Sequence, residues 1–63
     1  MSIHETAIIK KGASIDENVT IGPYSIIGEN VKISSGTFVD SHVCIDGDTL
    51  IGKNNKIYPF SSI

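Results

Sequence analysis

Arginine, a second cysteine and long apolar runs are all missing from this 63-residue sequence, and each absence narrows the possible functions. Five lysines stand against seven acidic residues, so the chain lacks the cationic surface that binding to nucleic acid requires. Cys44 has no partner for an intrachain disulfide, and nothing points to an oxidising compartment. No stretch approaches the ~18 apolar residues of a membrane span. Since residues 1–6 also lack the regions of a signal peptide, we expect a cytoplasmic protein without a nucleic-acid partner and without a membrane span.

What the sequence does contain is a six-residue repeat of aliphatic residues. Four positions after each of its first ten members stands a small or β-branched residue, with Asn55 as the exception. A period of six is a multiple of the two-residue period of a β-strand and does not fit a 3.6-residue helix. A hexapeptide repeat is typical of a parallel β-helix, so we expect an all-β domain over residues 1–63. The repeat runs without interruption through Ile3, Ile9, Ile15, Ile21, Ile27, Ile33, Val39, Ile45, Ile51, Ile57 and Ile63.

The turn residues predict how the hexapeptides are arranged. If each is numbered from its aliphatic residue, positions one and five point inward, position six points outward, and positions two to four turn a corner. In two of every three repeats, position four holds a residue type that tolerates positive φ. These residues are Gly12, Asn18, Asn30, Gly36, Asp48 and Asn54. Glycines at position two are expected to ease tight bends, at Gly22, Gly28 and Gly52.

The remaining repeats carry Thr6, Tyr24, His42 and Phe60 at position four, where we expect no left-handed residue. Prolines stand just before Tyr24 and Phe60, which marks the same corner again. This alternation predicts three hexapeptides per coil, and therefore a triangular prism of about three and a third coils.

Position six of one face gives an outward stripe that is mostly apolar, formed by Ile8, Ile26, Cys44 and Ser62. Such a stripe favours a role in contacting a partner. The repeat breaks off at Ile63 without a polar capping unit, and solenoids need caps to protect their last coil. We therefore expect a chain truncated at its C-terminal end, whose open end offers coil-on-coil stacking as a second route of association.

Three segments carry a resemblance to a known family: IHETAI (3–8), IGPYSIIG (21–28) and above all SHVCIDGDTLIGKNNKIYPFSSI (41–63). They resemble the start of the bacterial acyl-carrier-protein-dependent UDP-N-acetylglucosamine O-acyltransferases. The resemblance covers the chain from Ile3 to Ile63, but only the first part of such an enzyme. Glu5 stands where the family commonly has proline, which affects only the entry turn.

The resemblance implies a left-handed parallel β-helix and a homotrimer. It also implies transfer of a 3-hydroxyacyl chain from acyl carrier protein to the 3-hydroxyl of UDP-N-acetylglucosamine, the first step of lipid A biosynthesis. The family's general base and its nucleotide ligands lie beyond Ile63, so no catalytic residue is carried over to this sequence. Its substrate-binding residues stay unknown, and we expect the chain alone to be inactive.

The two histidines are the only bases that titrate near neutral pH. His4 is expected to be solvated at a turn. Asp40 lies two residues before His42 and could orient it as a base, but His42 falls in the corner column between Tyr24 and Phe60. We expect its ring to be stacked between the two others. Cys44, at an outward position, is expected to act as a small hydrophobe rather than as a nucleophile.

Other chemistries lack the residues that they need. A zinc site takes three converging imidazoles, and two are present in unrelated turn positions. The glycines belong to separate corners and not to a phosphate-binding loop. Three acidic residues are expected to be solvated at corners: Asp40, Asp46 and Asp48. The same is expected of Lys10 and Lys11, which follow each other in the sequence. We expect neither a metal nor a cofactor.

Two functions of different class stay open. The chain is either the N-terminal part of the acyltransferase or a non-catalytic structural and assembly module. The intact mass of the cellular protein distinguishes them.

Overall fold

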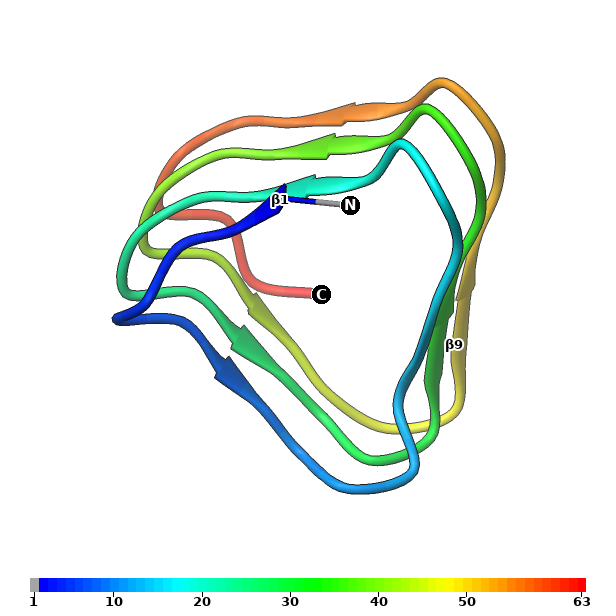
Figure 1. Ribbon diagram of the computed structural model, residues 1–63. Coiled ribbons are helices and arrows are strands. Elements are labelled where there is room, and N and C mark those ends of the chain that lie inside the picture. The colour runs from blue at the N-terminus through cyan, green and yellow to red at the C-terminus, as the bar shows by residue number, and fades with distance from the viewer. Residues whose placement is uncertain (1) are drawn as a thin grey trace.

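The computed structural model describes residues 2–63, which coil into a triangular prism of parallel strands (Figure 1). The strands form three parallel sheets, one on each face, with the orders β1-β4-β7-β10, β2-β5-β8 and β3-β6-β9. Each sheet therefore contains every third strand in sequence order. This arrangement confirms the predicted all-β parallel solenoid of about three coils. The strands are β1 (Ser2–Ile3), β2 (Ile8–Ile9), β3 (Ser14–Ile15), β4 (Thr20–Ile21), β5 (Ile26–Ile27), β6 (Val31–Ile33), β7 (Phe38–Val39), β8 (Cys44–Ile45), β9 (Thr49–Ile51) and β10 (Lys56–Ile57).

Neighbouring coils pair in one constant register. Ile26 lies beside Cys44 and Ile33 beside Ile51, in each case eighteen residues further along the chain. The ladder bonds repeat with the hexapeptide. Backbone N–H groups at positions six and two donate to carbonyls at positions five and one of the next coil, as in Gly28 N–H to Ile45 O at 2.7 Å. Position one of the next coil donates back to position six, as Ile63 N–H does to Cys44 O at 2.9 Å.

The aliphatic repeat fills the inside of the prism, as predicted. Ile27 and Ile45 are 0% exposed and Ile33 is 2% exposed, so each contributes roughly 1.5–3 kcal/mol of burial before the entropy cost of ordering. Burial weakens toward the two ends, where Ile3 is 38% and Ile63 51% exposed. The buried core consists of Val19, Ile21, Ile27, Val31, Ile33, Val39, Val43, Ile45 and Ile57.

Two hydroxyl side chains are buried at inward position five, and both are hydrogen-bonded. Ser25 Oγ donates to Asp40 O at 2.8 Å, and Thr37 Oγ1 donates to Gly52 O at 2.8 Å. Each bond reaches fifteen residues along the chain to position two of the coil above. The hydroxyls therefore cost little to bury and tie each coil to the next.

Four of the expected left-handed corner residues are confirmed: φ is +98° at Gly12, +59° at Asn18, +81° at Gly36 and +56° at Asn54. The prediction is wrong for Asn30 and Asp48, which do not have positive φ. At that corner strands β6 and β9 start one residue early, because Val31 pairs with Thr49. Longer pairing holds Asn30 and Asp48 outside the left-handed region. Gly47, at φ +79°, turns the upper coil instead.

The prediction that the third corner contains no left-handed residue is also wrong. Tyr24, His42 and Phe60 have φ of +59°, +56° and +62°. Pro23 and Pro59 explain two of them, because proline followed by positive φ is the signature of a type II turn. The strain of a bulky left-handed residue, about 1–2 kcal/mol, has to be offset by contacts of the side chains.

Two of the three position-two glycines are needed for close approach rather than for an unusual bend, since none of the three has positive φ. A Cβ at Gly22 would lie 2.7 Å from the carbonyl carbon of Asp40 in the coil above. One at Gly28 would lie 3.1 Å from the Cα of Asp46. A Cβ at Gly52 would meet nothing nearer than the Asn55 side chain at 3.4 Å. The expected tight bends are therefore close contacts between coils at Gly22 and Gly28.

Candidate functional site

Three rings stack in a column along the third corner of the prism. The His42 ring lies 5.2 Å from Tyr24 at an interplanar angle of 28°, and 4.8 Å from Phe60 at 16°. The eighteen-residue spacing of the three residues places them at the same corner of successive coils. The stacking expected for His42 is confirmed, and such pairs contribute about 0.5–1.5 kcal/mol each. This contribution offsets the strain of the left-handed backbone at the corner.

The carboxylate of Asp40 is engaged with the corner backbone. Asp40 Oδ1 accepts a hydrogen bond of 2.8 Å from the Ser41 backbone N–H. Its backbone carbonyl accepts the Ser25 hydroxyl. No hydrogen bond joins Asp40 to His42 among the described residues, so the structure does not assemble the carboxylate–histidine pair that base catalysis needs.

His4 closes the lower end of this corner. Its Nδ1 lies 2.8 Å from Thr6 Oγ1 and accepts a 3.2 Å bond from the Thr6 backbone N–H. Thr6 Oγ1 in turn accepts the backbone N–H of Tyr24 at 3.0 Å. His4 is exposed, as expected, but it also helps to fix the first coil to the second.

The predicted outward stripe is present on the face formed by β2, β5 and β8. Ile8 is 54% and Ile26 38% exposed, and the Cys44 thiol is free and exposed. Direct strand pairing holds the three side chains in line, with Ile8 beside Ile26 and Ile26 beside Cys44. The stripe is a continuous apolar surface on a flat face.

A second surface cluster was not found from the sequence. The ammonium group of Lys56 lies 5.3 Å from the Tyr58 ring centroid and 5.9 Å from that of Phe38. Phe38 and Lys56 both occupy outward position six and are eighteen residues apart. The predicted register was therefore sufficient to place these two side chains beside each other. Cation–π contacts at exposed sites are worth about 0.5–1 kcal/mol.

The charged corner residues are exposed, as expected for Lys10, Lys11, Asp46 and Asp48, whereas Asp40 is half-buried. Residues 2–63 form no pocket, and they contain no group of three His, Cys, Asp or Glu side chains placed to hold a metal. The expected absence of metal and cofactor stays a prediction. No helix of the described chain is long and apolar enough to cross a membrane.

Comparison with known proteins identifies related sequences. Residues 1–35 match the bacterial transferase hexapeptide family (six repeats). The chain is 57% identical over 61 residues to a protein of Thermodesulfovibrio yellowstonii, and 64% identical over 62 residues to one of Albidiferax ferrireducens. Both are named acyl-[acyl-carrier-protein]–UDP-N-acetylglucosamine O-acyltransferase. The matches cover 97% and 98% of this chain but 24% of each relative, so the chain spans about a quarter of their length.

The same name belongs to a protein of Psychrobacter that is 51% identical over 61 residues, again 97% of this chain and 24% of the relative. These matches confirm the resemblance carried by the motifs at 3–8, 21–28 and 41–63. The family match is also consistent with the left-handed coil that the resemblance implies.

Proposed function

Because this chain belongs to the bacterial transferase hexapeptide family, we propose that its 63 residues form the first coils of an acyltransferase. The enzyme moves a 3-hydroxyacyl chain from acyl carrier protein to the 3-hydroxyl of UDP-N-acetylglucosamine, the first step of lipid A biosynthesis. The observation that carries this proposal is the 51–64% identity to relatives of that name along nearly the whole chain.

In this proposal the chain provides structure and the coils that follow provide the chemistry. Acyl transfer to a hydroxyl needs a general base within hydrogen-bond reach of it and donors for the oxyanion. The ring of His42 is stacked between two aromatic rings, and its neighbour Asp40 is bonded to the backbone. The sequence has no arginine to hold a diphosphate. The prism of residues 1–63 acts as one domain and as the base on which later coils build the site.

A chimera tests the proposal. The matching N-terminal segment of the Albidiferax ferrireducens enzyme is replaced by this chain, and acyl transfer to UDP-N-acetylglucosamine is measured. We expect kcat/KM within about tenfold of the parent, because the junction preserves the six-residue register. A matched chimera carrying Ile33→Asp should lose its fold and its activity. A folded chimera without activity would show that these coils do not fit such an enzyme.

The isolated 63-residue chain should show no acyl transfer, with or without His42→Ala. Turnover by the chain that disappears in the His42→Ala variant would reverse the assignment of His42 as a structural residue. Turnover that persists in the variant would place a catalytic base elsewhere in residues 1–63.

For assembly, we propose a homotrimer in which the stripe of Ile8, Ile26 and Cys44 faces a neighbouring subunit. The supporting observation is the continuous exposed apolar line on one flat face. Replacing Ile8 and Ile26 by lysine should reduce the trimer to monomers in sedimentation, whereas Leu50→Lys on another face should not. An unchanged trimer in the double variant removes the stripe from the interface.

For location, we propose the cytoplasm, supported by a single cysteine that has no disulfide partner within the chain. Cell fractionation with an antibody to the protein tests this.

A non-catalytic assembly module is the second candidate, and the exposed stripe is the observation that favours it. The intact mass of the cellular protein separates the two. A mass near 6.7 kDa supports the module, and a mass about four times larger supports the enzyme.

A further inference from the structure

The proposed homotrimer needs a second contact surface besides the stripe of Ile8, Ile26 and Cys44. In a closed ring of three copies, each copy touches its two neighbours through two different surfaces, because a flat face packs on its own counterpart only about a twofold axis. The stripe lies on one flat face, so it can serve only one of these contacts. A different surface of the neighbouring copy must receive it.

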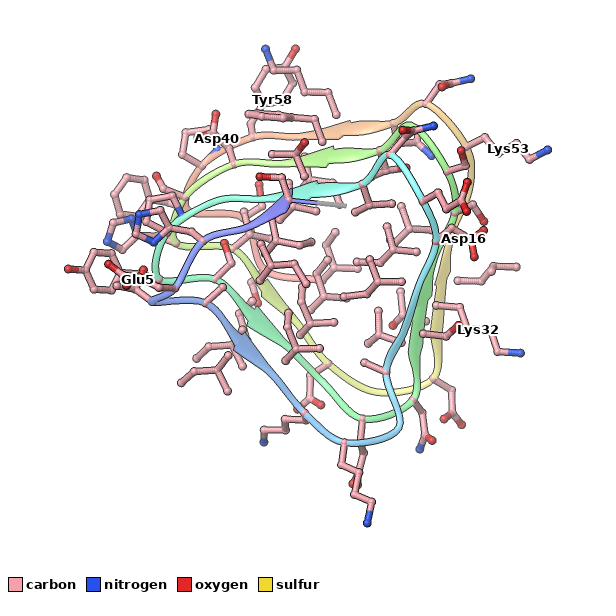
Figure 2. All side chains as sticks on the ribbon, viewed as in Figure 1. Glu5, Asp16, Lys32, Asp40, Lys53 and Tyr58 are labelled. Carbon is pink, nitrogen blue, oxygen red and sulfur yellow. The ribbon has the colours of Figure 1, made fainter. Side chains whose placement is uncertain are left out.

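Most of the other outward surfaces are charged. The face of β3, β6 and β9 presents Lys32, and the face of β1, β4, β7 and β10 presents Lys56, so covering either face would take a lysine out of water. Figure 2 shows Asp16 and Lys53 at one corner, away from the corner that carries Glu5. The two corners without aromatic rings hold Lys10, Lys11, Asp16, Glu17, Glu29, Asp46, Asp48 and Lys53. Lysine and carboxylate side chains are depleted at protein interfaces, so these surfaces are poor candidates.

The corner column of Tyr24, His42 and Phe60 differs from them, because it contains no lysine and no carboxylate. Tyr24 is 61% exposed, and His42 is exposed although it is stacked on both sides. Stacking covers the ring faces with one another, so the exposed surface of the column consists of ring edges. Glu5 and Asp40 lie at this corner but outside the column, at positions three and two. Aromatic side chains are enriched at interfaces, so the column is the best candidate.

The column also lies where a ring of three needs it. Each copy in such a ring meets both neighbours on the side that faces the threefold axis, so its two contact surfaces have to be close together. Tyr24 precedes Ile26 by two residues, and His42 precedes Cys44 by two, so the column and the stripe flank each other along the prism. Surfaces on opposite sides of the prism would instead give an open chain or a larger ring.

We propose that the corner column of one copy packs against the stripe of the next copy, about a threefold axis that runs along the prism. This inference rests on the proposed homotrimer and names the surface that completes it. Rotation about such an axis does not change the height of a residue along the prism, so each coil meets the same coil of its neighbour.

This register pairs the two rows one side chain per coil. Both rows repeat every eighteen residues, so they stay in step along the prism. Ile26 then faces the Tyr24 ring of the neighbouring copy, and Cys44 faces its His42. All four residues lie in coils that have another coil above and below them, so the contact does not require an open end of the prism.

The first test replaces a ring of the column and measures the mass by sedimentation velocity under reducing conditions. Tyr24→Lys should weaken the trimer by about thirtyfold, the scale of one central aromatic residue at an interface. Phe60→Lys is a second variant of the same column, and circular dichroism checks the fold of both. Leu50→Lys makes the same kind of change at a side chain that is 73% exposed on another face, and should leave the trimer intact.

The second test mixes two defective variants. The Ile8→Lys, Ile26→Lys variant keeps its column, and the Tyr24→Lys variant keeps its stripe. Each alone should be a monomer, whereas the mixture should form a one-to-one dimer, because one intact contact remains and the ring cannot close.

Cys44 reports the contact without any substitution, since it is the only cysteine and its thiol is exposed in a single copy. Iodoacetamide should alkylate it about tenfold more slowly in the trimer than in the Tyr24→Lys monomer, because thiol reactivity follows exposure.

The outcomes separate this inference from the homotrimer itself. An unmodified chain that stays a monomer would overturn both. A trimer that tolerates Tyr24→Lys and Phe60→Lys but not the stripe variant would overturn the role of the column alone. So would a mixture of two folded variants that forms no dimer.

Discussion

Ile33→Asp tests whether the aliphatic repeat is the source of stability. Ile33 is 2% exposed on β6, the middle strand of its sheet, and pairs with Ile15 and Ile51. Replacing it removes roughly 1.5–3 kcal/mol of burial. It also places an unpaired carboxylate in an apolar interior, which costs several kcal/mol more. A 63-residue domain has a total stability of only about 3–9 kcal/mol at the usual value per residue. The variant should therefore be unfolded at 25 °C.

The assay is urea unfolding followed by far-UV circular dichroism. Leu50→Asp is the matched control, because it makes the same chemical change on the neighbouring strand β9 at a side chain that is 73% exposed. We expect the control to unfold within about 0.5 kcal/mol of the unmodified chain. A cooperative transition for Ile33→Asp with the same midpoint as the control would refute the assignment of Ile33 to the core.

Three further predictions concern the contacts between coils, and urea unfolding measures each. Gly22→Ala should destabilise the chain by roughly 1–3 kcal/mol, because its Cβ would meet the Asp40 backbone at 2.7 Å. Gly52→Ala should be near neutral, because its Cβ would make only an ordinary 3.4 Å contact with the Asn55 side chain. Equal effects would contradict the close approach. His42→Ala should cost about 1–3 kcal/mol by removing two stacked pairs, and His42→Tyr should retain most of that stability. If alanine and tyrosine are equivalent, stacking does not stabilise the corner. Thr37→Val should cost about 0.5–1.5 kcal/mol through loss of the bond to Gly52 O, with the outward Thr20→Val as control. A neutral Thr37→Val would exclude that role for the hydroxyl.

The sequence was sufficient to predict the core and the number of repeats per coil. The aliphatic period identifies Ile27 and Ile45 as buried because strand side chains alternate between two faces, so a period of six keeps these residues on one face. The prolines and the column of Tyr24, His42 and Phe60 recur every third repeat, which is the spacing of neighbouring coils. Given that register, the stacking of His42 follows from position alone.

The backbone conformation at the corners was less predictable. Asn30 tolerates positive φ but does not require it, and pairing of Val31 with Thr49 decides the outcome. At the third corner, Pro23 did contain the signal of a type II turn, but the bulk of Tyr24 argued against positive φ. Stacking between coils offsets that strain, and it is a tertiary effect that single-residue preferences do not contain.

The eighteen-residue register underlies the fold, the corner stack and the proposed interface stripe of Ile8, Ile26 and Cys44. One cross-linking measurement tests this register directly. Ile26 and Cys44 are paired neighbours on β5 and β8, both facing outward. As paired neighbours, residues 26 and 44 should have their Cα atoms within the ~4.4–6.8 Å separation that a disulfide needs. The new thiol of the Ile26→Cys variant should therefore be able to bond to Cys44. Oxidation of the dilute variant should then give a monomer with no free thiol, seen by mass spectrometry. Ile8→Cys, one coil further away from Cys44, should keep both thiols free. Closure of the Ile8→Cys bridge in preference to the Ile26→Cys bridge would contradict the register.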